Sequence, residues 1–408
     1  MAAAFSEMTT KRDPRILIVA EFAPGAPGGD WVNLKQHFRG LDWGQIYWWS
    51  FSDPSGSACR EFGGRHSSCK IPSRLTPNLR WNGLKGWIVD SFVIPYAVRH
   101  LLSFIRSVEP ELIFLMARGW MIPLAHCVMP QVKTHWHMAL YDMPDVDGMV
   151  QRLGRRRTGR FMHMAETIYR NASSRSVISP AIAEDMRLRT GVECSNFFRC
   201  AVEPEAMARL REPAPKPPDD VIRIGYAGVI IAEPTFARLV KALQKIRGQL
   251  SRRVEIHLYG SQLYSDRDWF DPDLIIEHGF ISDAELNRHY RAGTWGLAIM
   301  HLEDIDPRYN HFSFPCKFSM SLASGLPLIC LGHRQSPLIE LAKDYHLGLV
   351  STESDIDKLA ASLREGLEDF SRFDKYRTEI LRCAETEFSA ERKRQKLHQL
   401  LDAARKNS

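Results

Sequence analysis

The chain has 408 residues, of which 44% are hydrophobic and 25% are charged, and its formal net charge is +6. This composition is typical of a globular protein with room for two domains, and the small positive charge suits an anionic substrate or a membrane surface without indicating nucleic-acid binding. The eight cysteines include no C-x-x-C pair and no run of about 18 apolar residues is present, so we expect free thiols in a reducing compartment and no membrane span.

The first half of the chain alternates short apolar runs, which predict strands, with amphipathic segments, which predict helices. We expect strands at 15–20, 45–49, 111–116, 134–140 and 175–178, and helices at 31–39, 93–107, 161–172 and 181–190. Residues 52–82 are polar and predict a long functional or mobile loop. Such alternation is typical of a parallel sheet with helices on both faces. No signal-peptide pattern precedes the first strand, which favours a cytoplasmic protein.

A proline-rich segment, residues 213–218, interrupts this alternation, which then starts again at Ile222. We therefore predict an α/β protein with two Rossmann-like domains. The predicted parts are an N-terminal domain at 1–205, a C-terminal domain at 206–385 and an amphipathic C-terminal helix within 386–408.

The most informative stretch runs from Leu274 to Gly332. A short strand is followed by Ser282 or Asp283, which can cap a helix, and a later strand at 295–300 leads into an acidic loop. A further helix is predicted to start near Pro315 and to stop at Gly325. Lys317 would lie in its first turn, where unpaired backbone amides and the helix dipole favour a diphosphate.

Two segments of this stretch, HGFISDAELNRHYRAG and FPCKFSMSLASGLPLICLG, resemble the donor-binding blocks of the family-four group of GT-B glycosyltransferases. The resemblance implies two domains facing across a cleft, with the last helix crossing back to the first domain. It also implies retaining transfer of a sugar from a UDP-, GDP- or ADP-sugar to a saccharide or lipid-linked acceptor, as in polysaccharide biosynthesis. No metal and no cofactor are expected.

The resemblance places the nucleotide sugar in the second domain. Lys317 would neutralise the diphosphate as it leaves, and small residues at strand ends would let phosphate approach closely. Backbone groups that follow a strand-end glycine would contact the base. The residues concerned are Gly228, Gly260, Phe280, Ile281, Pro315, Lys317, Met320 and Ser321. A plain strand-to-helix turn is the alternative for the strand-end residues.

Two departures from the family pattern stand out. Relatives commonly carry a basic residue soon after the glycine at Gly228, whereas this chain continues VIIAEPTF. Met320 also occupies the position where the family has a glutamate that reaches the ribose hydroxyls. Ser319, Ser321 or Glu303 could take over that contact.

In the first domain, the loop of Gly28, Gly29 and Asp30 is expected to meet the acceptor or the donor phosphate, although a bare turn is the alternative. Asp142 follows a strand and could orient an acceptor hydroxyl or steady positive charge on the sugar. The acidic loop that contains Glu303 would contact sugar hydroxyls, or would simply be solvated. The catalytic set is therefore Asp142, Lys317 and Glu303.

Other interpretations stay open. The chain could be a nucleotide-sugar epimerase of related fold, or a non-catalytic homologue that binds a saccharide or a partner protein. His135 and His137 alternate to one face of a strand and could bind a metal, but hydrogen-bonded strand histidines are commoner. The aromatic-rich segment 81–105 could contact the inner face of a membrane, or could pack against the first sheet.

Overall fold

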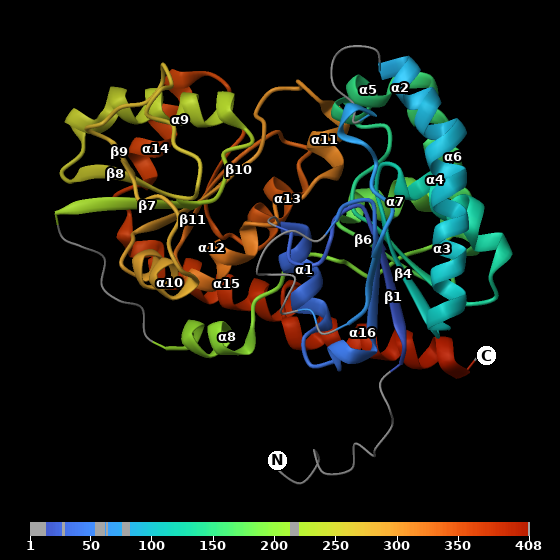
Figure 1. The fold of residues 1–408 in the computed structure, drawn as a ribbon. Coiled ribbons are helices and arrows are strands. Elements are labelled where there is room, and N and C mark those ends of the chain that lie inside the picture. The colour runs from blue at the N-terminus through green and yellow to red at the C-terminus, as the bar shows by residue number, and fades with distance from the viewer. Residues whose placement is uncertain are drawn as a thin grey trace, which may run out of the picture. The chain divides into compact units, whose positions relative to one another are not determined.

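The computed structural model describes residues 14–26, 29–53, 62, 64–75, 82–212 and 220–406. The chain divides into two compact units, Met1–Phe198 with Arg394–Ser408, and Arg199–Lys393. Each unit is an α/β structure built on one six-stranded sheet (Figure 1). The proline-rich segment 213–218 and Gly28 lie outside the described residues.

The first sheet has the strand order β3-β2-β1-β4-β5-β6, and all of its strands are parallel. Its strands are β1 (Ile16–Ala20), β2 (Ile46–Ser50), β3 (His66–Ser68), β4 (Leu112–Ala117), β5 (His135–Leu140) and β6 (Ser174–Val177). Every residue of β1 and β4 is apolar and buried, as expected of central strands covered on both faces. The long polar stretch therefore contains a short strand, β3, which pairs with β2 at the sheet edge.

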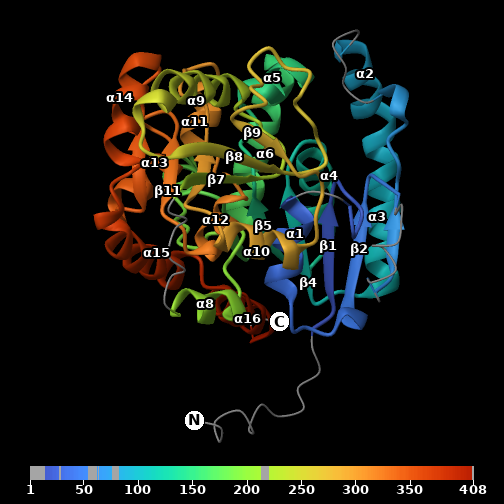
Figure 2. The ribbon, with the colours of Figure 1, turned by 90° about the vertical axis from the view of Figure 1, so that its left-hand side faces the viewer.

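The helices of this unit follow the strands in alternation, and α1 and α3 lie on opposite sides of the sheet (Figure 2). They are α1 (Gly29–Phe38), α2 (Asn82–Ile88), α3 (Ile94–Val108), α4 (Met121–Val128), α5 (Asp147–Leu153), α6 (Arg155–Asn171) and α7 (Pro180–Thr190). The last helix, α16 (Ala390–Lys406), belongs to this unit from Arg394 onward. Short 3-10 turns are η2 (Trp43–Gln45), η4 (Ser73–Leu75) and η6 (Met129–Gln131).

The second sheet repeats this arrangement with the order β12-β11-β10-β7-β8-β9, again all parallel. Its strands are β7 (Val221–Ala227), β8 (Arg253–Tyr259), β9 (Ile275–Glu277), β10 (Trp295–Ile299), β11 (Leu328–Leu331) and β12 (Gly348–Ser351). Its helices are α8 (Pro204–Leu210), α9 (Glu233–Ile246), α10 (Asp283–Arg291), α11 (Pro307–Phe312), α12 (Phe318–Ser324), α13 (Pro337–Asp344), α14 (Ile356–Gly366) and α15 (Phe373–Glu387), with the 3-10 turns η7 (Arg247–Gln249) and η8 (Phe370–Arg372). Helix α8 packs against α12 and α15, so the boundary between the units lies before it, at residues 198–199.

In both sheets, the order in which the chain adds strands reverses at the same point. The first strand of each unit, β1 or β7, lies in the middle of its sheet, and the fourth strand, β4 or β10, pairs with it on the side opposite the second. In each sheet, the loops that follow the two neighbouring strands (β1 and β4, or β7 and β10) therefore leave in opposite directions. Ligands of open parallel sheets bind at such points, outside the carboxyl ends of the strands.

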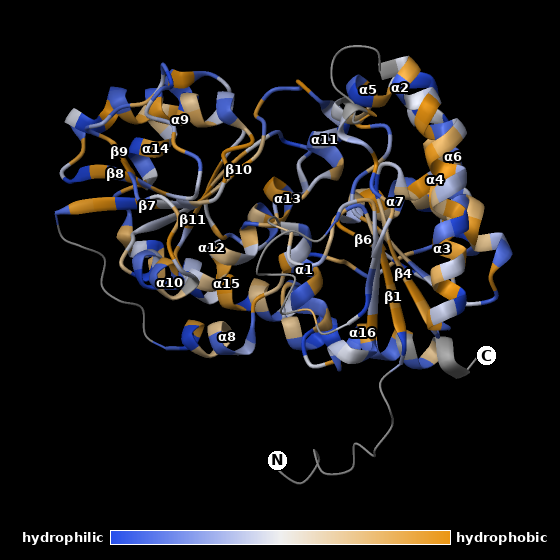
Figure 3. Cartoon of the chain, viewed as in Figure 1, coloured by the Kyte–Doolittle hydropathy of each residue, from blue (hydrophilic) through white to orange (hydrophobic). Residues whose placement is uncertain are grey.

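Helices α2 and α3 are continuous through a π-helical turn, η5 (Val89–Val93), and form one long helix. Its buried side carries Ala97, Leu101 and Ile105, whereas its other side exposes the large apolar residues Leu84, Trp87, Phe92 and Tyr96. Apolar residues therefore lie on both sides of this helix (Figure 3). Residues Gly83–Val108 are long and apolar enough to cross a membrane by length and composition alone, so the expectation of no span does not follow from composition.

Candidate functional site

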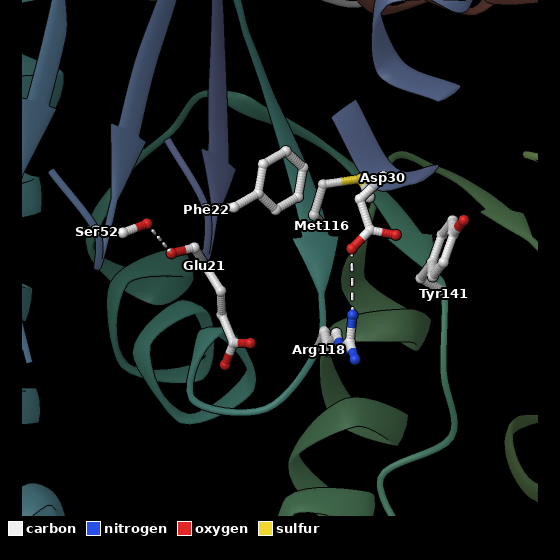
Figure 4. Close-up of a pocket in the computed structure, with 7 residues that line it drawn as sticks. All are labelled: Glu21, Phe22, Asp30, Ser52, Met116, Arg118 and Tyr141. Carbon is white, nitrogen blue, oxygen red and sulfur yellow. Dashed lines mark hydrogen bonds and ion pairs between the residues drawn. The ribbon is translucent and has the colours of Figure 1, made fainter. Parts of the chain in front are cut away.

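Charged residues follow the central strands of the first sheet at the point where the chain reverses. Glu21 comes directly after β1, Arg118 directly after β4, and Tyr141 and Asp142 directly after β5. Asp30 lies in the first turn of α1. These residues meet around a cavity of about 270 Å³, which Figure 4 shows with Glu21, Phe22, Asp30, Ser52, Met116, Arg118 and Tyr141 on its walls.

Arg118 joins the two acidic residues that the sequence singled out in this unit. Its Nη1 lies 3.1 Å from Asp30 Oδ2, and its Nε lies 3.3 Å from Asp142 Oδ2. Burial raises the pKa of Asp142, and the Arg118 guanidinium opposes that shift. Burial alone would lower the pKa of Arg118, but the surrounding carboxylates raise it instead. Arg118, on the cavity wall, thus holds both Asp30 and Asp142 in ion pairs.

Glu21 is fixed beside this ion pair. Its Oε1 accepts a hydrogen bond from the Trp120 backbone N–H at 2.9 Å, and burial raises the pKa of its carboxyl group. Gly119 makes this approach feasible, because it has a φ of +47° and a Cβ there would lie 2.2 Å from Glu21 Oε1. Ser52 donates to the Glu21 carbonyl at 2.8 Å and holds the loop from the neighbouring strand.

The sequence identified Asp30 and Asp142 but missed Glu21 and Arg118. Each of the two missed residues is charged and comes directly after a wholly apolar strand, and this strand-end position could have pointed to both. Gly29 is the first residue of α1, next to Asp30, whereas Gly28 lies outside the described residues.

In the second unit, Lys317 reaches back to the loop that follows β7. Its Nζ donates to the Val229 carbonyl, which also accepts from the Tyr226 hydroxyl at 3.1 Å. The ammonium group lies 5.4 Å from the centre of the Tyr226 ring. Burial lowers the pKa of Lys317 to about 8. The predicted pair of Lys317 and Gly228 is thus brought together at the reversal point of the second sheet.

Gly228 is required for this contact. It has a φ of +96°, and a Cβ at this position would lie 2.5 Å from Lys317 Cε. The loops after β8 and β9 adjoin it, since a Cβ on Gly260 would lie 3.3 Å from Gly228 Cα and the Gly260 N–H donates to the Gly279 carbonyl at 2.9 Å. Gly228 thus contacts the Lys317 side chain, Gly260 adjoins Gly228, and Gly279 adjoins Gly260.

The two residues after Gly279 differ in their surroundings. Phe280 is 84% exposed, and its ring is free to contact a ligand. Ile281 packs against a small apolar cluster that includes Tyr259 and Tyr290. Ile281 thus anchors the loop, whereas Phe280 is its accessible side chain.

The segment around α12 departs from the prediction in two ways. The helix begins at Phe318 rather than near Pro315, so Lys317 precedes the helix and half-buried Pro315 belongs to the turn before it. Ser321 is buried and hydrogen-bonded to Tyr290, and Ser319 is buried and donates to the Cys316 carbonyl at 3.2 Å. Both hydroxyls are buried and already hydrogen-bonded, which argues against either as a substitute ribose contact, and the donor-binding role of Ser321 stays a prediction. Met320 is 40% exposed on the same helix.

The acidic side chains of the loop after β10 all contact other residues of the same unit. Glu303 forms an ion pair with Arg238 of α9, and Asp304 lies 3.6 Å from His333 Nε2. Asp306 caps α11 by accepting from the Tyr309 N–H at 2.8 Å. The catalytic role predicted for Glu303 would require it to leave Arg238, and it stays a prediction beside the solvated alternative.

The strand histidines are hydrogen-bonded rather than arranged for a metal. His137 contacts the hydroxyls of Ser174 and Ser176 on β6 at 2.8 and 2.9 Å, and His135 contacts Ser173 at 3.1 Å. Burial lowers the pKa of His137 to about 3. Within the described ranges, no group of three or more His, Cys, Asp or Glu side chains could hold a metal ion, and the cysteines there are free thiols.

Comparisons with known proteins agree with this geometry. Residues 239–370 match the family described as "Glucosyltransferase 3-like, C-terminal domain". No curated protein matches the sequence.

Solved structures resemble almost the whole chain. A glycosyltransferase from Rickettsia africae has a TM-score of 0.67 at 12% identity, covering 98% of this chain and 100% of that one. A sucrose-phosphate synthase from Thermosynechococcus elongatus has a TM-score of 0.65 at 17% identity, covering 96% and 99%. HepE of Anabaena, solved with UDP and glucose, has a TM-score of 0.62 at 13% identity, covering 96% and 100%.

These likenesses extend over both units and confirm the predicted fold. The chain has the two-domain α/β architecture of GT-B glycosyltransferases, and its second unit contains the stretch that matches a glucosyltransferase-like C-terminal domain.

Proposed function

We propose that this chain is a retaining glycosyltransferase, which moves a sugar from a nucleotide-sugar donor to a hydroxyl group of a saccharide or lipid-linked acceptor. The donor binds to the second unit, where Lys317 lies beside Gly228. The acceptor binds to the first unit, beside Asp30, Asp142 and Glu21. No metal ion takes part.

The observation that carries this proposal is the contact between Lys317 and the strand-end loop of Gly228. A cation beside a close-approach glycine, at the reversal point of a parallel sheet, is suited to a diphosphate. Residues 228–231 carry no charge, so Lys317 is the cation of this site, and the basic residue that relatives commonly carry soon after this glycine is missing. As the bond between the sugar and the diphosphate breaks, Lys317 stabilises the negative charge that develops on the leaving group.

The nucleotide and the stereochemistry are inferred from the neighbours. HepE was solved with UDP-glucose, which makes UDP-glucose the first donor to test. A trehalose-6-phosphate synthase with a TM-score of 0.63 and 11% identity is described in terms of glycosyl transfer with retention, which supports retention in this chain. The neighbours named for an activity are a glycosyltransferase, a sucrose-phosphate synthase and a trehalose-6-phosphate synthase, so the epimerase alternative gains no support from them.

Calorimetric titration with UDP-, GDP-, ADP- and TDP-glucose, with and without EDTA, tests the donor site. One nucleotide should bind in the presence of EDTA, because the positive charge comes from Lys317. Binding that requires added magnesium or manganese would refute the metal-free site. Failure of every nucleotide sugar to bind would leave only the non-catalytic alternative.

We further infer that the protein acts in the cytoplasm at the membrane surface, in the synthesis of a polysaccharide. The exposed face of the long helix supports the membrane contact, because Leu84, Trp87, Phe92 and Tyr96 are each more than half exposed. Trp87 and Phe92 pack edge to face with their centroids 5.8 Å apart. Exposed Arg99 on the same helix adds the positive charge that favours anionic lipid headgroups.

Co-sedimentation with vesicles of anionic or zwitterionic lipid tests this contact. The paired change Trp87→Ser and Phe92→Ser should reduce binding to anionic vesicles by about tenfold or more, since each ring loses apolar area that the membrane would cover. Leu188→Ser is the matched control, because Leu188 is 70% exposed on α7. Equal binding by the paired variant and the control would refute the membrane contact.

A further inference from the structure

The first unit contains a second and larger cavity beside the one in Figure 4. It has a volume of about 610 Å³, and it shares the walls formed by Glu21, Ser52 and Arg118 with the smaller cavity. The two cavities therefore form one hollow along the carboxyl edge of the sheet, with Glu21 and Arg118 at their junction.

The two ends of this hollow carry opposite charge. Asp30 lines the smaller end, and Asp142 lies beside it on the same guanidinium. The larger end is lined by Lys70 and Arg152. The positive charge of Arg118 is already shared between two carboxylates, so it adds little at either end.

Lys70 and Arg152 are both available to a ligand. Lys70 Nζ lies 3.5 Å from Asp53 Oδ2, but both side chains are more than half exposed, and such a pair contributes little and exchanges readily. Arg152 is exposed in the last turn of α5 and has no ion-pair partner among the described residues. Two cations therefore face one cavity with no strong partner of their own.

The other walls of the larger cavity suit a sugar. Buried Phe51, Trp120 and Leu153 supply apolar surface, and Glu21 supplies a carboxylate that is fixed by the Trp120 N–H. Carboxylates accept hydrogen bonds from sugar hydroxyls, and cations bind phosphate or carboxylate groups.

We propose that the acceptor is a saccharide that carries a negatively charged group, a phosphate or a carboxylate. Its hydroxyls contact Glu21 and Asp30, and its anionic group lies between Lys70 and Arg152. The assignment of this molecule as the acceptor rests on the proposed function, but the binding site itself does not.

Binding to the full chain without any donor tests the site directly. Glucose, glucose 6-phosphate, glucuronic acid and octyl glucosyl diphosphate are titrated calorimetrically at low salt. At least one anionic probe should bind about tenfold or more tightly than glucose, since a charge-assisted contact has that effect. A preference for octyl glucosyl diphosphate would identify a lipid-linked source, and a preference for glucose 6-phosphate or glucuronic acid would identify a soluble one.

The paired change Lys70→Ala and Arg152→Ala should abolish the preference for the anionic probe. Lys133→Ala is the control, because Lys133 is an exposed lysine before the amino end of β5, at the opposite edge of the sheet. Equal affinity for glucose and for all anionic probes would overturn the proposal. So would a preference that persists in the paired variant.

Binding of UDP separates this inference from the proposed function. If UDP binds to a site that requires Lys317 while no anionic probe prefers the parent chain, the acceptor inference fails and the donor assignment stands. If an anionic probe binds through Lys70 and Arg152 while no nucleotide binds, the anion site stands and the transferase assignment fails.

Discussion

Replacement of Lys317 is the most informative perturbation of the donor site. Lys317→Met removes the charge while keeping a side chain of similar length over the Tyr226 ring. A hydrogen bond from a charged group contributes about 1.5–3 kcal/mol, so UDP should bind about 10–150-fold more weakly to the variant. The Gly228 loop should keep its conformation, because its backbone is also held by the Tyr259 carbonyl.

The lowered pKa of Lys317 predicts a second effect, a pH dependence of UDP affinity. Because burial lowers this pKa to about 8 in the free protein, about nine-tenths of the side chains are protonated at pH 7 and about one-tenth at pH 9. A diphosphate binds the protonated form, so the affinity of the parent chain should fall about tenfold between these pH values. Lys317→Met should lack this dependence, and Lys317→Arg should also lack it because arginine stays charged at both pH values.

Isothermal titration of UDP at pH 7, 8 and 9 measures both effects in one series. Lys358→Ala is the control for a lost positive charge, because Lys358 is exposed on α14 of the same unit. Equal UDP affinity in the parent chain and Lys317→Met at pH 7 would refute the placement of the diphosphate. A parent chain whose affinity does not change with pH would refute the role of the lowered pKa.

Three further predictions concern other parts of the two units. Met320→Glu should preserve or tighten UDP binding in calorimetry, because Met320 is 40% exposed and a glutamate there would again offer an acceptor to the ribose hydroxyls. A variant that folds but no longer binds UDP would contradict this. Arg118→Met should lower sugar transfer while leaving UDP affinity unchanged, since Arg118 positions Asp30 and Asp142 in the first unit, and a changed UDP affinity would argue against that role. His137 has a pKa lowered to about 3, so the unfolded chain binds a proton below pH 6.5 that the folded chain does not; stability should fall by about 2 kcal/mol from pH 6.5 to pH 5 in urea unfolding, and a His137→Asn variant with the same pH slope would contradict this.

The two strands in the middle of the first sheet, β1 and β4, could be predicted because each is a continuous apolar run. Runs such as Ile16–Ala20 and Leu112–Ala117 are buried on both faces, so no polar residue interrupts them. The cap of α10 was also readable, since Ser282 and Glu285 form a capping box three residues apart. Local sequence determines these features.

The parts of the site that depend on distant residues could not be predicted. Ser321 is buried and hydrogen-bonded to Tyr290 of α10, and Glu303 is held by Arg238 of α9. Neither contact can be predicted from the local sequence, because each joins residues that are far apart in the chain. Lys317 could be identified because its motif places it, although its contact with the Val229 carbonyl depends on long-range packing, in which α12 lies against β10.

Glu21 and Arg118 could be predicted only in part. The position of each after a buried strand is visible in the sequence, but their importance comes from the strand order, which puts β1 and β4 side by side. Gly119 gives a further local hint, because a glycine after Arg118 permits the close approach of Glu21. Strand order is a long-range property, and no single segment encodes it.

The central claim is that the chain transfers a sugar from a nucleotide donor with retention. Proton NMR of the chain with UDP-glucose and a panel of neutral, phosphorylated and lipid-linked saccharides follows the anomeric signals directly. We expect release of UDP and the appearance of an α-linked product signal with at least one acceptor, both lost in Lys317→Met. A β-linked product would contradict retention, and conversion of the donor into another nucleotide sugar without release of UDP would contradict transfer itself.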